Sequence, residues 1–465
     1  MKSVASSDAR LLIISHDIVG SAMAGPGIRY YQLARALAPH LPVTLVAPNP
    51  PEPALAQGFA IAEYRRRDYA SLAPLVADAD ICFFASDVAD ELPQLAASGC
   101  YLVVDGYDPL MAEWLALSHR LPAEQRQREW RRRMVELARQ YRLGDFFVCA
   151  SERQRDWWLG QLEASGRLNP ATIDADPSLR NLVDVVPYGL PDAPLPPARP
   201  VIRGVWPGIA PSDRLLVWGG GLWPWLDPLS AIRAVAELCK EMPAVKLVFP
   251  GTRHPSPDMA AMPTLNDEAR ALASELGVLD THVFFGDWVP YSDWPAVLQE
   301  CDVALTLHHA ALETRLAFRS RVLEYIWAGL PTVATTGDTT SDLIRQYELG
   351  ELVAESDVAG IVAALRTLLA EPRGARSAAF ARARRELTWS RAAEPLLRFC
   401  RAPHHAADKT VEGGVYLYDE AASLRQERDD WRELAQAYAR GRVVRALNWV
   451  EMKRRAWLGG APDRE

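Results

Sequence analysis

Two arginines crowd the start of a short helical pattern in the segment 313–335, ETRLAFRSRVLEYIWAGLPTVAT. Residues 321–328 form an amphipathic pattern that Gly329 and Pro331 close, and Arg319 and Arg321 lie at its beginning. A helix start carries partial positive charge and ordinarily attracts acidic side chains, so cations there need an explanation. A bound polyanion supplies one, because backbone amides and arginines would then face the same ligand.

The residues around this helix start suit a nucleotide. We expect Ser320 to cap the helix, and the amides from Ser320 to Val322, together with Arg321 or Arg319, to meet a pyrophosphate. Glu324 lies one turn further in, where a carboxylate can accept hydrogen bonds from the two hydroxyls of a ribose. The alternative is a surface ion pair between Arg321 and Glu324 at i,i+3 spacing, which stabilises a helix little.

Glycines cluster after the first expected strand of each half. The first cluster, IVGSAMAGPGIRYY, lacks the G-x-G-x-x-G dinucleotide pattern, but its glycines let the backbone approach a ligand closely. The residues expected to meet an anion or a sugar there are Ser21, Gly25, Gly27 and Arg29; a flexible turn is the alternative. The second cluster, VWGGGLWPWLDPLSA, contains consecutive glycines whose amides can form an anion nest: Gly219, Gly220 and Gly221. Asp227 is the expected N-cap of the helix that follows.

Short apolar runs alternate with helical patterns along most of the chain, a rhythm typical of βαβ units and parallel sheets. Buried strands are predicted within 10–16, 42–48, 80–86, 101–107 and 146–151, and again within 214–220, 245–251, 282–287, 302–308 and 332–336. A proline-rich stretch from Pro187 to Pro200 separates the two groups. We therefore predict two Rossmann-like, doubly wound α/β domains that face a cleft, 1–195 and 196–403, followed by a C-terminal helical extension, 404–465.

The helical extension has two notable patterns. Leu424, Trp431 and Tyr438 recur at seven-residue spacing, which indicates a coiled coil and a homodimer. From Arg440 to Trp457 the extension becomes basic and amphipathic, which suits an anionic membrane surface. A helix packed on the body with a solvated basic face is the alternative interpretation.

Composition limits the classes of function. The formal net charge of the 465 residues is -8, which argues against a general nucleic-acid binder. The six cysteines are scattered, several of them in apolar runs, as expected for reduced core residues of a cytosolic protein. No run reaches the length of a transmembrane helix or reads as a signal peptide. The expected location is cytoplasmic, with peripheral attachment to the inner face of the cell membrane.

The order of the motifs resembles that in retaining GT-B glycosyltransferases of the large glycosyltransferase family 4. More narrowly, the motifs are similar to those of a bacterial branch found among surface-polysaccharide glycosyltransferases. The resemblance extends to about Pro403. The stretches that carry it are VVDGYDPL, ASERQRDWWLG, VVPYGLPD, GGGLWPWLDPL, DWVPY and LETRLAFRSRVLEYIWAGLPTVAT. Taken together these motifs are specific, whereas each one alone is weak.

The resemblance implies roles for individual residues. The family has two glutamates spaced E-x7-E. The second, which binds ribose, matches Glu324, whereas the first, which binds the donor sugar, falls on Leu316 and leaves Glu313 as the nearest acid. Where the first domain often supplies a histidine to the donor sugar, this chain has Asp105 and Asp108. The nucleobase would rest on the segment Trp288, Val289 and Pro290.

The implied reaction is transfer of a sugar from a UDP- or GDP-type nucleotide sugar to a glycan or lipid-linked acceptor, with retention and without a cofactor or metal. Helix amides, the glycine loop and Arg321 would stabilise the leaving pyrophosphate. Glu313 and His309 are further candidate catalytic residues, and an inverting enzyme would instead use Asp105 or Asp108 as a base. Two alternatives remain open: a sugar-nucleotide epimerase of GT-B shape, and a nucleotide-sugar-binding scaffold without turnover.

Overall fold

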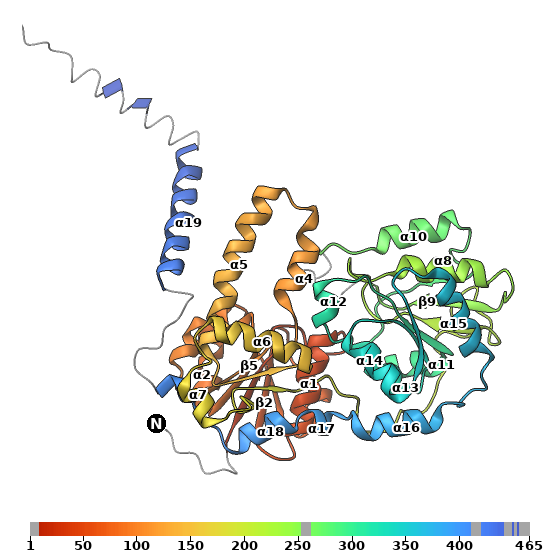
Figure 1. Cartoon of the computed structure of the whole chain (residues 1–465), viewed down its shortest axis with the longest axis horizontal. Helices are drawn as coiled ribbons and strands as arrows, with labels where there is room; N and C mark the ends of the chain where they lie inside the picture. The colour runs from red at the N-terminus through yellow and green to blue at the C-terminus, as the bar shows by residue number, and fades with distance from the viewer. Residues whose placement is uncertain (1–8, 253–261, 411–419, 441–448, 451–452, 455–465) are drawn as a thin grey trace, which may run out of the picture.

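The computed structural model describes residues 9–252, 262–410, 420–440, 449–450 and 453–454, and these form two parallel-sheet domains with a helical C-terminal region (Figure 1). The first sheet has the order β3-β2-β1-β4-β5-β6-β7. Its strands are β1 (Leu11–Ile14), β2 (Val43–Ala47), β3 (Ala60–Glu63), β4 (Ile81–Ala85), β5 (Tyr101–Asp105), β6 (Phe146–Cys149) and β7 (Val183–Val185). Its helices are α1 (Gly25–Leu37), α2 (Tyr69–Asp78), α3 (Val88–Glu91), α4 (Leu110–Leu117), α5 (Ala123–Leu143), α6 (Glu152–Ala164) and α7 (Pro170–Ala175).

The second sheet repeats this design with the order β10-β9-β8-β11-β12-β13. Its strands are β8 (Arg214–Val217), β9 (Val245–Phe249), β10 (Val283–Phe285), β11 (Val303–Thr306), β12 (Thr332–Thr335) and β13 (Gly350–Val353). Its helices are α8 (Pro228–Leu238), α10 (Asn266–Glu275), α11 (Trp294–Glu300), α12 (Leu312–Leu316), α13 (Ser320–Ala328), α14 (Thr339–Tyr347), α15 (Val358–Ala370) and α16 (Ser377–Glu386). The predicted pair of doubly wound domains is thus confirmed.

The strands form because their residues suit burial on both faces of a parallel sheet. β1 reads LLII and β4 reads ICFFA, and every residue of both is buried. All the strands predicted from apolar runs are present. The sequence interpretation missed β3, β7 and β13, which are edge strands, because an edge strand is short and needs no continuous apolar run.

The chain returns to the first domain after α16. α17 (Trp389–Ala392) lies next to α1, and α18 (Glu394–Arg401) places Phe399 on Phe146 of β6 with ring centroids 4.9 Å apart (Figure 1). Arg398 Nη2 also donates to Asp184 Oδ2 at 3.0 Å. The predicted boundary at residue 403 stays a prediction, but these two helices, assigned to the second domain from sequence, pack on the first.

The C-terminal region contains α19 (Glu420–Arg440), which lies beside α5 of the first domain (Figure 1). Leu424, Trp431 and Tyr438 are all exposed on it. The predicted homodimer therefore stays a prediction. Most of the predicted membrane-surface helix, residues 441–448, 451–452 and 455–457, lies outside the described residues. Among the helices that the structure does describe, none has the length and apolarity needed to cross a bilayer.

Candidate functional site

A cavity of about 1350 Å³ lies between the two domains. Its walls are the loops and helix starts that follow the carboxyl ends of the strands, where ligands of open α/β sheets bind. The first domain contributes the segments after β1, β4 and β5, and the second contributes those after β8, β9 and β10 together with α12 and the start of α13. The predicted site residues that line it are Gly25, Asp108, Gly219, Gly220, Gly221, Trp288, Glu313, Arg319, Ser320 and Arg321.

The start of α13 faces this cavity. Arg319, not Ser320, is the capping residue, and Ser320 is the first residue inside the helix. Arg319, Ser320 and Arg321 all line the cavity, so first-turn amides that lack intrahelical partners are close to it. Val322 is different, because its side chain is fully buried and its amide donates to Arg319 O at 3.0 Å. The prediction that Val322 contacts a ligand is wrong.

The glycine loop after β8 packs directly against α13. Gly219 N donates to the Tyr325 hydroxyl at 2.8 Å, and a methyl group on Gly219 would lie 2.8 Å from the same oxygen. Gly220 has a φ of +94°, a conformation that favours glycine, and it lies against the Arg321 side chain. Asp227 caps α8, as predicted, by accepting from Ser230 N at 2.9 Å. The loop and the helix start thus form one wall of the cavity.

Arg321 and Glu324 form an ion pair at the edge of this wall. Arg321 Nη1 and Trp294 Nε1 both donate to Glu324 Oε2 at 2.7 Å, and the guanidinium lies 4.9 Å from the centre of the Trp294 ring. Burial disfavours the charged guanidinium, but the Glu324 carboxylate outweighs this effect and raises the pKa of Arg321. The pair predicted as an alternative therefore exists, but not on the open surface: Arg321 lines the cavity, whereas Glu324 is buried behind it and is not among the residues that line it.

Glu313 is held in a second arginine pair. The structure places it on α12, whereas the sequence interpretation assigned this stretch to a loop. Arg319 Nη1 and Nη2 donate to the two Glu313 oxygens at 2.7 and 2.8 Å, and Arg319 Nε lies 3.9 Å from Asp338 Oδ2. Asp338 also lies 3.7 Å from Nε2 of His308, whose pKa is lowered by burial. Glu313 is thus held in position by Arg319, which itself lies between Glu313 and Asp338.

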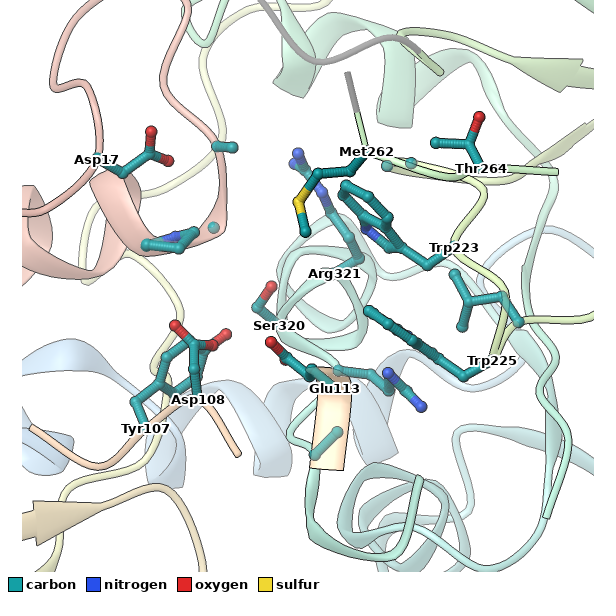
Figure 2. Close-up of a pocket in the computed structure, with 18 of the residues that line it drawn as sticks. Asp17, Tyr107, Asp108, Glu113, Trp223, Trp225, Met262, Thr264, Ser320 and Arg321 are labelled. Carbon is teal, nitrogen blue, oxygen red and sulfur yellow. The ribbon is translucent and has the colours of Figure 1, made fainter. Parts of the chain in front are cut away.

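The opposite wall comes from the first domain, and two of its carboxyls point into the cavity. Figure 2 shows Asp108 and Glu113 directed toward Ser320. Burial, with the nearby Glu113 carboxyl, raises the pKa of Asp108 well above its ordinary value. Burial, with the Glu313 carboxyl of the other domain, raises the pKa of Glu113 to about 7, although Arg319 opposes this shift. These three carboxyls therefore influence one another across the cavity.

Replacing Glu113 by glutamine is expected to stabilise the protein in a pH-dependent way. The folded chain keeps a proton that the unfolded chain loses near pH 4.5, so wild-type stability falls as the pH rises from 4.5 to about 7, and the loss persists above that. The variant lacks this titration and should gain about 1–2 kcal/mol at pH 8 and less at pH 5. Urea denaturation at both pH values checks this, with Glu124→Gln on α5 as control; equal gains at both would contradict it.

Tyr107 connects the two walls, because its hydroxyl and the Ser320 hydroxyl lie beside each other at Gly25. The ring itself is buried and lies 4.7 Å beneath the Arg29 guanidinium. Replacing Tyr107 by phenylalanine removes this polar contact and should lower the free energy of unfolding by about 0.5–1.5 kcal/mol, the usual net value of one hydrogen bond. Thermal denaturation measures this change, and unaltered stability would mean that the contact between the two hydroxyls does not join the domains in solution.

Two charged residues predicted to contact a ligand are buried behind the first wall. Arg29 Nε and Nη2 donate to Asp105 Oδ2 and Oδ1 at 2.7 and 2.9 Å, and both residues are at most 3% exposed. Neither lines the cavity. The prediction that they meet an anion or a sugar is corrected: the two charges satisfy each other and hold the end of β5 beside α1.

Other predicted contacts of the first glycine cluster are also corrected. Ser21 is exposed and bonds to Glu52 through its amide and hydroxyl, and its carbonyl accepts from Tyr291 N at 2.7 Å. A methyl group on Gly27 would lie 2.1 Å from Ile18 O, so Gly27 permits close packing rather than ligand contact. Of this cluster, only Gly25 among the predicted residues lines the cavity.

Three predictions in the second domain are corrected as well. His309 is half-exposed outside the cavity, and its Nδ1 lies 3.1 Å from Glu355 Oε1, which removes it from the candidate catalytic residues. Val289 lines only a small neighbouring cavity of about 20 Å³, which also includes Trp288 and Arg321. Pro290 lines neither, and its carbonyl accepts from Asp293 N.

Beyond the predicted site residues named above, a carboxyl and two tryptophans line the cavity. Glu113 lies at the start of α4, just after the carboxyl end of β5, and that placement is the signal that would have identified it. Trp223 and Trp225 stack with ring centroids 5.8 Å apart and line the cavity beside Arg321 (Figure 2). Together with Trp288 they offer flat apolar surfaces suited to a base or a sugar ring.

Comparisons with known proteins agree with this architecture. Residues 213–386 match the family described as glycosyl transferases group 1. No curated protein sequence matches the chain significantly.

Among solved structures, Anabaena Alr3699/HepE in complex with UDP and glucose has a TM-score of 0.60 and 15% identity, over 84% of this chain and 98% of its own. Sucrose-phosphate synthase from Thermosynechococcus elongatus has a TM-score of 0.55 and 14% identity, over 84% and 98%. WaaG, a glycosyltransferase involved in lipopolysaccharide biosynthesis, has a TM-score of 0.53 and 18% identity, over 87% and 100%. At these identities the likeness concerns the fold. The chain therefore has GT-B architecture, and residues 213–386 of its second domain match the family described as glycosyl transferases group 1.

Proposed function

We propose that the protein is a retaining glycosyltransferase of the family 4 type, which moves a sugar from a nucleotide-diphosphate sugar to a glycan or lipid-linked acceptor in surface polysaccharide or glycoconjugate synthesis. The observation that carries the proposal is the single wall formed by the start of α13, the loop Gly219–Gly221 and Arg321. Helix amides, the amides of Gly220 and Gly221 and an arginine all favour a pyrophosphate, whereas the Gly219 amide already donates to Tyr325. The likeness to a protein crystallised with UDP and glucose supports a nucleotide sugar.

The same wall is suited to the chemistry of the leaving group. In the transition state the sugar acquires oxocarbenium character and negative charge grows on the pyrophosphate. Fixed donors aimed at that charge lower the barrier. Arg321 is already positioned against the Trp294 ring and Glu324, so little reorganisation is needed when the pyrophosphate arrives.

Retention requires no protein nucleophile in a front-face reaction. The bond between the anomeric carbon and the phosphate oxygen breaks, and the acceptor oxygen bonds to the same face of that carbon. The acceptor proton passes to the departing phosphate oxygen. An inverting enzyme would need a base in the first domain, and only Asp108 of the two aspartates predicted for that role faces the cavity. The anomeric configuration of the product, read by NMR, decides between the two courses.

A donor screen tests the proposed function. UDP-, GDP-, ADP- and dTDP-sugars are incubated with the protein, with and without a lipid-linked acceptor, and nucleoside diphosphate release is measured. Release that depends on the acceptor supports the transferase. A new sugar nucleotide without an acceptor would indicate the epimerase. Nucleotide binding without any product would indicate the scaffold.

Chelation tests the proposed independence from metal. Arg321 and the helix start can balance the charge of the pyrophosphate, so treatment with EDTA should leave the transfer rate unchanged. Loss of the rate on chelation and its recovery with Mg²⁺ or Mn²⁺ would contradict this part of the proposal.

A further inference from the structure

The first turn of α6 carries a buried glutamine that contacts both domains. Gln154 belongs to the stretch ASERQRDWWLG, which has no role in the proposed function. The Ser151 hydroxyl caps the helix by accepting from Gln154 N at 3.1 Å, and Gln154 is only 2% exposed. A buried side-chain amide needs partners for its oxygen and for its nitrogen, so those partners show what Gln154 holds.

Three hydrogen bonds fix this side chain. Gln154 Oε1 accepts from Ala150 N at 2.6 Å, and Nε2 donates to Tyr107 O at 2.7 Å and to Leu316 O at 2.8 Å. The reverse orientation of the amide would direct its oxygen at two carbonyl oxygens, so only one orientation satisfies all three partners. Because Leu316 belongs to the second domain, this one amide joins the two domains.

Both carbonyls that accept from Gln154 belong to the walls of the cavity. Tyr107 follows β5 and lines the cavity on the first-domain side. Leu316 is the last residue of α12, and Glu313 of the same helix lines the cavity on the second-domain side. Gln154 therefore ties the loop after β5 and the end of α12 to a common point.

The neighbouring Arg153 makes a second contact between the domains. Its Nη1 donates to Gly337 O at 2.8 Å, and its guanidinium forms an ion pair with Asp342 on α14. The side chains of this pair are 36% and 43% exposed, and ion pairs that exposed stabilise a structure little. The buried amide of Gln154 is therefore the contact that determines how α12 lies against the first domain.

We infer that Gln154 is a positioning residue for the transferred sugar, because it holds α12 and the first-domain wall at a fixed separation. This inference rests on the proposed function, in which the pyrophosphate binds at the start of α13 and the sugar beside it lies between α12 and the loop after β5. The three partners of Gln154 lie outside α13 and the loop Gly219–Gly221, which hold the nucleotide. Loss of the amide should therefore affect the transfer step and spare nucleotide binding.

The test compares turnover with nucleotide affinity. Turnover is measured with the donor and acceptor that are active in the donor screen, and Kd for UDP and GDP is measured by calorimetry. Gln154→Ala should lower kcat about 10–100-fold, the scale expected when a reacting group is misplaced by about 1 Å, and should change Kd for the nucleoside diphosphate less than about twofold.

Two further variants keep the test decisive. Gln154→Met retains the length of the side chain and lacks the amide, so it should show the same separation of kcat from Kd, and it carries the test if Gln154→Ala does not fold. Gln140→Ala removes another buried glutamine of the first domain, on α5, and should keep the wild-type kcat. Thermal denaturation of each variant sets a temperature at which it is folded.

Three results would overturn the inference while leaving the proposed function intact. The first is a wild-type kcat in the folded Gln154 variants. The second is a loss of nucleoside diphosphate affinity as large as the loss of kcat, and the third is an equal loss of kcat in Gln140→Ala. Failure of the wild-type protein to bind any nucleoside diphosphate would instead overturn the proposed function, and the inference with it.

Discussion

Replacing Arg321 by alanine should slow transfer about 10²–10³-fold in kcat, the effect of removing one preorganised donor to a developing anion. Arg321 lines the cavity beside Gly220 and the start of α13, and it is the guanidinium best placed to meet the leaving pyrophosphate. Arg319 does not substitute for it, because both its terminal nitrogens are engaged by Glu313. The kinetics of nucleoside diphosphate release measure the change.

A change in the structure around Glu324 would also lower the activity of Arg321→Ala. This effect must be separated from the loss of a donor to the pyrophosphate. Arg321 is the ion-pair partner of Glu324, so its removal leaves a buried carboxylate held by Trp294 alone. The ratio of affinities for a nucleoside diphosphate and its monophosphate isolates the proposed role, and it should fall in Arg321→Ala. Arg366→Ala, which breaks the exposed pair with Glu241, is the matched control. Near-normal turnover of Arg321→Ala would remove this residue from the mechanism.

Replacing Glu324 by glutamine should weaken binding of the nucleoside diphosphate about 10–100-fold, the range expected when a hydrogen bond to a charged group is lost. Oε2 of Glu324 accepts from both Arg321 and Trp294, so Oε1 is the oxygen proposed to meet the ribose. Glutamine keeps the volume of the side chain and loses its charge, which spares the packing of α13. Calorimetry gives both dissociation constants.

The ribose itself supplies the control for Glu324. Wild-type protein should prefer UDP, or GDP, to its 2′-deoxy analogue, and Glu324→Gln should bind the two about equally. If the preference for ribose survives in the variant, Glu324 acts by holding Arg321 and not by contacting the nucleotide.

The fold was predictable because most of its strands are continuous apolar runs in the sequence. Runs such as LLII in β1 and ICFFA in β4 are apolar throughout and lie between helices on both faces of a parallel sheet. The sequence interpretation missed β3 and β13 because half-exposed edge strands carry no continuous apolar pattern. The packing of α18 on the first domain was missed for another reason. The contact between Phe399 and Phe146 joins residues that are far apart in the chain, so no local sequence pattern reveals it.

The site was predictable where backbone geometry defines it. Gly219 to Gly221 and Arg319 to Arg321 lie at positions that the βαβ pattern fixes, and both line the cavity. Side-chain pairing was not predictable. Arg29 on α1 and Asp105 at the end of β5 were both assigned to the site, yet each satisfies the other behind the wall. Glu113, one helix turn beyond the loop, is open to the cavity instead.

The most direct test of the account is a structure of the protein with the nucleoside diphosphate that it binds. We predict that the pyrophosphate lies against the start of α13, within hydrogen-bonding distance of Ser320 N and Arg321 and beside Gly220, with the ribose hydroxyls on Glu324 Oε1. A nucleotide bound elsewhere, or one whose pyrophosphate contacts neither α13 nor the glycine loop, would contradict it.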